Sequence, residues 1–76
     1  MVMSESEWIS AFAARVGQEV PSDAQRDAIL ALAGVAAHAS GRVAAPIACW
    51  LAGAAGLSAR EAVELARLVD QSASEG

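Results

Sequence analysis

The sequence predicts an all-α fold, a compact bundle of four helices joined by short loops. At three places just before an apolar run, a serine is followed three residues later by Glu or Gln, the pattern of a capping box at a helix N-terminus. Apolar residues then recur at helical spacing, and no segment alternates in the manner of a half-buried strand. We therefore expect a single helical domain over residues 1–76. Its helices are expected at 4–17, 22–40, 45–55 and 58–72, with a frayed tail at 73–76.

The first expected helix is amphipathic. Ser4 and Glu7 form its capping box, and Gly17 suits its C-terminal cap. One face is apolar and the opposite face is polar, which is typical of a helix that lies on a core. The apolar face consists of Trp8, Ile9, Phe12, Ala13 and Val16. We expect Trp8, and Trp50 in the third helix, to be core anchors.

The second expected helix begins at a capping box of Ser22 and Gln25. Beyond its first turns it has no charged face, so we expect it to be buried on several sides. Gly34 costs about 1 kcal/mol of helix propensity relative to alanine, which favours the close approach of another helix there. Gly41 is expected to end the helix in a left-handed cap.

The third and fourth expected helices have equally clear limits. Pro46 lies in the first turn of the third, where its missing N–H costs nothing, and Gly56 ends it. Ser58 opens the fourth helix, whose inner face is expected to contain Ala62, Leu65, Ala66 and Val69. Val63 and Leu68 flank this face and make the apolar arc wider than one contact in a bundle requires. These two residues are therefore candidates for an interface with another subunit.

Composition limits both the core and the classes of function. The chain is 55% apolar, but 20 of its 76 residues are alanine, which buries little surface. A monomer of this length is expected to be marginally stable, and self-association is a natural remedy. The net charge is −4 and the arginines are not clustered, so nucleic-acid binding is not expected.

No metal, cofactor or membrane association is expected. Cys49 is the only cysteine, so it forms no disulfide within the chain, and no Cys/His spacing suits a metal. The apolar stretch 28–59 is interrupted at Gly41 and Pro46, which leaves pieces too short to cross a membrane. The N-terminus is acidic where a secretion signal is basic, so we expect a cytoplasmic location.

His38 and Arg42 are the candidate ligand-binding residues, at the turn between the second and third helices. They are the only residues of the stretch 28–59 that can carry a positive charge. Together with N–H groups at the start of the third helix, they could grip a small anion. The alternative is structural: both side chains could bond the last carbonyl groups of the second helix. No nucleophile and base stand together in the sequence, so no catalytic residue is predicted.

The segment from Leu30 to Gly53 resembles a family of small helical domains of actinobacteria, DUF6457. The family pattern is a helix that ends in alanine and histidine, then an arginine, then an alanine-alanine-proline start to a helix rich in Leu, Ala and Gly. The matching positions are His38, Arg42, Ala44, Ala45, Pro46, Leu51 and Gly53, with Trp8 near the start of the chain. Two departures are Val43, where a proline is usual, and Ile47-Ala48-Cys49, where leucine and threonine are usual.

The resemblance implies an accessory role. Members of this family occur alone or attached to guanylyltransferases of molybdenum cofactor synthesis, and the resemblance supplies no catalytic residue. We therefore expect a non-catalytic module that binds a protein partner or itself, forming a homo-oligomer. The alternative is a domain that binds a small anionic ligand through His38 and Arg42.

Overall fold

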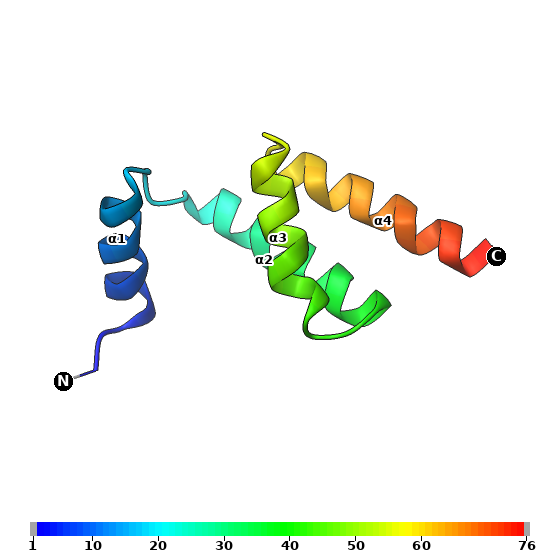
Figure 1. Cartoon of the computed structure of the whole chain (residues 1–76), viewed down its shortest axis with the longest axis horizontal. Helices are drawn as coiled ribbons and strands as arrows, with labels where there is room; N and C mark the ends of the chain where they lie inside the picture. Colours follow the sequence, from blue (N-terminus) through cyan, green and yellow to red (C-terminus); the bar gives the residue numbers. More distant parts are fainter. Residues whose placement is uncertain (1, 76) are drawn as a thin grey trace.

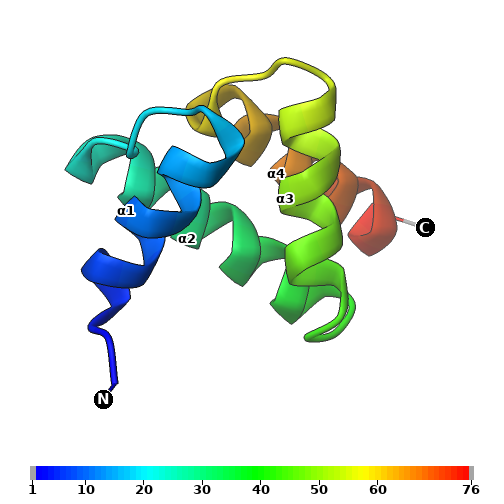
Figure 2. The same cartoon turned by 60° about the vertical axis from the view of Figure 1, so that its left-hand side comes forward.

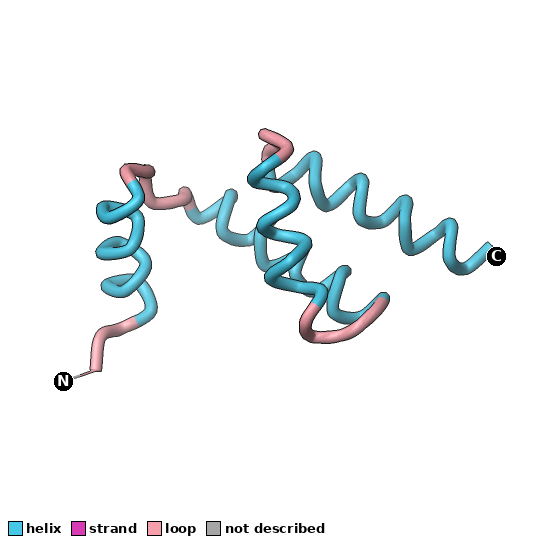
Figure 3. The backbone as a smooth tube through the Cα atoms, viewed as in Figure 1, coloured by secondary structure: helices cyan, strands magenta, loops and turns pink. Residues whose placement is uncertain are grey.

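The computed structural model describes the backbone of residues 2–75 and the side chains of residues 2–69. It confirms the all-α class and the four-helix bundle with short loops (Figures 1 and 3). The helix ends lie within one residue of the expected ones, except that the last helix continues to Glu75. Gly76, the end of the expected frayed tail, lies outside the described residues. The helices are α1 (Glu5–Val16), α2 (Asp23–Ala39), α3 (Ala44–Ala54) and α4 (Ala59–Glu75).

All three predicted capping boxes form. In each, the N–H of the third helical residue donates to the serine hydroxyl, and the Glu or Gln side chain accepts from the serine N–H. The donor–acceptor distances are 2.8 to 3.2 Å. The pairs are Ser4 with Glu7, Ser22 with Gln25, and Ser58 with Glu61.

Glycine ends two of the helices as predicted, and a third end differs. Gly17 and Gly56 both have a φ of 73°, the left-handed conformation that glycine adopts without a steric penalty. Gly41 is not in this conformation. The C-cap of α2 is instead Ser40, one residue before Gly41. The N–H of Ser40 donates to the carbonyl of Ala36. The turn into α3 therefore needs no left-handed residue, and the expected cap at Gly41 is corrected.

Helix α2 is the centre of the molecule. Both α3 and α4 pack against it, and the two diverge from the turn that joins them (Figure 1). The core cluster contains Leu32 from α2 and Ala62 and Val63 from α4, all at most 8% exposed. Helix α2 is nevertheless less buried than expected, because Leu32 is its one buried residue and Leu30 is 59% exposed; the expected burial on several sides is corrected. Among the described side chains none of the large ones is fully buried, so the core is small.

Helix α1 lies at one end of the molecule, beside the N-terminal part of α2 (Figures 1 and 2). An ion pair of 3.2 Å joins Glu5 of α1 to Arg26 of α2, and Ala13 is buried. The long axis of the chain measures 48 Å and the radius of gyration is 13.8 Å. About 11 Å is typical of a domain of this length, and the chain is more extended because α1 lies at one end and the C-terminal part of α4 at the other.

Three expectations about packing are corrected. Trp8 and Trp50 are not core anchors, because 55% and 77% of their surfaces are exposed. Gly34 has no neighbouring atom within 4 Å of the position that a Cβ would take, so no helix approaches closely there. The small residues of α2 therefore leave open space on this side of the helix.

Candidate functional site

The main candidate site is an apolar groove between α3 and α4, with α2 as its floor. Its volume is about 820 Å³, within the range of ligand and peptide sites. The groove exists because α3 and α4 each pack on α2 and diverge from one another (Figure 1). Its side chains include Leu32 and Val35 from α2, Ile47 and Leu51 from α3, and Leu65 and Val69 from α4.

The walls of the groove are apolar and open to solvent. Ile47 and Leu51 of α3 are 53% and 61% exposed, and Leu65 and Val69 of α4 are 50% and 70% exposed. In each helix the two residues are four positions apart, so they lie on one face. Among the side chains of residues 2–69, Arg42 is the only charged one that lines the groove. A surface of this kind binds apolar partners rather than charged ones.

The structure separates the two predicted ligand-binding residues. Both side chains are exposed, but Arg42 lines the groove and His38, in the last turn of α2, does not. Within residues 2–69 neither side chain takes part in a hydrogen bond or an ion pair. The alternative in which they bond the end of α2 is therefore not seen in the described residues. Anion binding by the pair stays a prediction.

The two predicted interface residues also differ. Leu68 is 56% exposed, so it is available to a partner, although it lies outside the groove. Val63 is only 8% exposed and belongs to the core cluster, which corrects its assignment to an interface. The reason is the orientation of α4: Ala62, Val63 and the half-buried Ala66 face α2. The larger Leu65, expected on the inner face, lines the groove instead.

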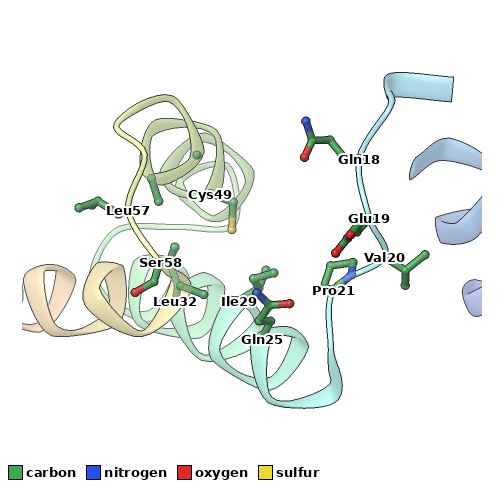
Figure 4. A pocket seen from close by; sticks show the side chains of 13 residues that line it. Gln18, Glu19, Val20, Pro21, Gln25, Ile29, Leu32, Cys49, Leu57 and Ser58 are labelled. Atoms are coloured by element: carbon green, nitrogen blue, oxygen red, sulfur yellow. The ribbon is translucent and has the colours of Figure 1, made fainter. Parts of the chain in front are cut away.

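A second, smaller opening lies between the α1–α2 linker and α3. Its volume is about 420 Å³. Gln18 and Val20 of the linker border it on one side and Cys49 of α3 on the other, with Ile29 of α2 below (Figure 4). Cys49 is half-buried and packs against the core cluster. No basic side chain lines this opening to activate the thiol.

Glu7 and Glu61 have lowered pKa values, and both belong to helix caps and not to either opening. The hydrogen bond from the Ser4 backbone N–H is the main cause that lowers the pKa of Glu7, and the Ser4 hydroxyl lowers it further. The same arrangement at Ser58 lowers the pKa of Glu61. Both carboxylates are fully exposed. They stabilise helix starts and supply no acid or base at a site.

Fold and site together define a small all-α domain with an open apolar groove. The chain belongs to the family described as a domain of unknown function, DUF6457, whose model matches residues 3–75. This confirms the family resemblance seen in the sequence. Comparisons with curated proteins and with solved structures gave no match.

Two further findings concern the described residues only. Across residues 2–75, no helix combines the length and hydropathy that a membrane span requires. Among the side chains of residues 2–69, no three of His, Cys, Asp or Glu gather in a group suited to a metal.

The groove was not predicted from the sequence. Leu65 and Val69 were expected on the inner face of the fourth helix, and no site was predicted at Ile47 and Leu51. Two alanines could have indicated which side of α4 contacts α2. Ala62 and Ala66 lie on the same side of α4 and allow close contact with α2. Larger residues beside such a contact remain at its edge.

Proposed function

We propose that this protein is a non-catalytic interaction module whose apolar groove binds a helix of a protein partner. The observation that supports it is the groove itself, in which Ile47, Leu51, Leu65 and Val69 are all at least half exposed. Amphipathic helices bind such grooves through apolar residues spaced three or four positions apart. The walls offer apolar residues at the same spacing.

The energy of such binding comes from apolar surface. The chain exposes 6128 Å² in total, whereas about 4,300 Å² is typical of a compact monomer of its mass. Each Å² of apolar surface removed from water contributes about 25 cal/mol. Burying the exposed apolar side chains of the groove walls therefore supplies several kcal/mol, from which the cost of association is subtracted.

The family suggests one partner. DUF6457 domains of actinobacteria resemble this chain, and such domains also occur attached to guanylyltransferases of molybdenum cofactor synthesis. We propose a cytoplasmic accessory role in which the groove binds a helix of such an enzyme. A domain that is fused to its enzyme is held near it at a high local concentration. A domain on a separate chain must instead bind the enzyme through its own affinity.

The test measures binding of the purified guanylyltransferase by titration calorimetry. Leu51→Gln changes the groove, and Leu68→Gln is its matched control, because both leucines are on helix surfaces and are 61% and 56% exposed. Burial of a half-exposed leucine is worth about 1.4 kcal/mol, so Leu51→Gln should weaken binding about tenfold. Leu68→Gln should leave the affinity unchanged. No binding, or an equal loss in both variants, would contradict the proposal.

The alternative function is binding of a small anionic ligand. One observation favours it: the exposed Arg42 lies at the edge of the groove, where it could pair with the acidic end of a partly apolar molecule. A thermal-shift screen of nucleotides, pterins and organic acids tests this. A stabilising ligand whose effect is lost in Arg42→Ala supports the alternative, and a screen without any shift speaks against it.

A further inference from the structure

We propose that a second copy of this chain occupies the groove, with α1 of each copy packed into the groove of the other. The dimer would be two-fold symmetric and would contain two identical contacts. This inference rests on the proposed function, because it uses the same groove. It adds that a second copy of the chain occupies the groove when no other protein partner is present.

Helix α1 presents an apolar ridge that its own chain leaves open. The ridge consists of Trp8, Phe12 and Val16, which are 55%, 53% and 52% exposed. These residues are four positions apart and so lie along one face of the helix. The rings of Trp8 and Phe12 stack, with centroids 5.1 Å apart and an interplanar angle of 17°. The pair therefore forms a preorganised aromatic surface.

Contacts within the chain use other residues of α1. Ala13 is buried, Ile9 is half-buried, and Glu5 pairs with Arg26 of α2. These contacts of α1 with its own chain can thus persist while the ridge contacts another molecule. No part of α1 has to unfold for the contact to form, which keeps the cost of association low.

Ridge and groove match in shape and polarity. The groove walls repeat at four-residue spacing, at Ile47 and Leu51 of α3 and at Leu65 and Val69 of α4. A row of side chains with the same spacing on α1 can lie between such rows, as ridges lie in grooves where helices pack. The signs of charge also agree: Glu5 and Glu7 lie in the first turn of α1, and Arg42 is the one charged residue among the described side chains that line the groove.

The shape of the chain favours a reciprocal pair. Helix α1 lies at one end of the 48 Å long axis, and α4 extends to the other end beyond α3 (Figure 1). When two copies lie side by side in opposite directions, α1 of each copy lies beside the α4 end of the other, and α4 forms one wall of the groove. A two-fold axis generates both contacts at once and leaves neither apolar surface open.

The exposed area is sufficient for a stable dimer. The chain exposes about 1,800 Å² more than a compact monomer of 7.7 kDa. A standard interface removes about 800 Å² from each partner, and stable homodimers often remove more. Covering half of the excess therefore reaches the standard size. The small core also favours a dimer, because contact with a second copy would bury additional apolar surface.

The experiment compares wild-type protein with two full-length variants by sedimentation velocity. The ridge variant carries Trp8→Gln with Phe12→Gln, and the groove variant carries Leu51→Gln with Val69→Gln. Each replaces residues that are at least half exposed, so the monomer fold should persist, which circular dichroism checks. The control is Trp50→Gln, which changes a 77% exposed residue that lines neither surface.

Wild type and control should be dimers at about 100 µM, and each variant should dimerise at least tenfold more weakly, a change of about 1.4 kcal/mol. Mixing the two variants should restore a heterodimer, because the intact ridge of one chain meets the intact groove of the other. Neither variant alone has such a contact. Pairing of ridge with ridge would leave the groove variant dimeric, and pairing of groove with groove would leave the ridge variant dimeric. Either result overturns the inference, as does a monomeric wild type.

A second measurement uses only the wild-type chain. In a mixture of isotope-labelled and unlabelled protein, filtered nuclear Overhauser spectra report contacts between different molecules. Aromatic protons of Trp8 and Phe12 should give signals to methyl groups of Leu51 and Val69. Their absence in a dimer overturns the inference even if a variant fails to fold.

The two proposals fail separately. If the wild type is monomeric but the guanylyltransferase binds and Leu51→Gln weakens that binding, the dimer inference is wrong and the proposed function stands. If the variants complement each other but no enzyme binds, the dimer stands and the accessory role is wrong.

Discussion

Replacing Leu32 by alanine tests whether the small cluster beneath α3 and α4 holds the fold together. Leu32 is the largest residue of the core and only 4% exposed. The change removes three carbon atoms at about 0.8 kcal/mol each, and the cavity that remains adds to this loss. We expect a decrease of about 3 kcal/mol in the free energy of unfolding. A domain of 76 residues has about 4 to 11 kcal/mol in total, so the effect is large.

The assay is urea denaturation followed by circular dichroism, with Leu68→Ala as the matched control. Leu68 is 56% exposed and lines no part of the groove, so its replacement should cost about 1 kcal/mol or less. Both proteins are measured at one concentration, because association would add to the apparent stability. Equal losses in the two variants would refute the assignment of Leu32 to the core.

The remaining predictions concern helix interiors, turns and caps. Gly34→Ala should raise the unfolding free energy by about 1 kcal/mol, because the site is helical and open, as thermal denaturation can show. Gly56→Ala should lower it by about 1 kcal/mol in the same assay, since φ is 73° there; a gain would contradict the left-handed turn. The hydrogen bonds from Ser58 lower the pKa of Glu61 in the folded state, so its stabilising effect is present above its ordinary pKa of 4.5 and is lost as the pH falls through the folded value. Glu61→Gln should therefore reduce the loss of stability on acidification below pH 4.5, and an unchanged acid titration would argue against this.

The helix ends could be predicted because they depend on neighbouring residues. A capping box needs only a serine and the Glu or Gln three positions later, and all three of these boxes form. The stops at Gly17 and Gly56 require only a residue that tolerates positive φ. The cap at Gly41 was wrong because Ser40 ended α2 without a left-handed residue. Such alternatives have similar energies and are not distinguished by the local sequence.

The candidate site was only partly predictable. The sequence indicated that Arg42 stands at the turn between α2 and α3, and the structure shows it exposed at the edge of the groove. It also indicated that the apolar arc of the last helix is too wide for one contact. It did not indicate which part of that arc would remain open, and so it selected Val63, which is buried.

The sequence by itself determined four helices, their limits and an excess of apolar surface over what a small alanine-rich chain can bury. Only the tertiary structure decided which apolar residues face the core. On α4 the side with Ala62 and Ala66 approaches α2, and this draws Val63 inward and leaves Leu65 at the groove. The physical reason is that a helix with a wide apolar arc can rotate at little cost, so its orientation depends on the shape of the helix it meets.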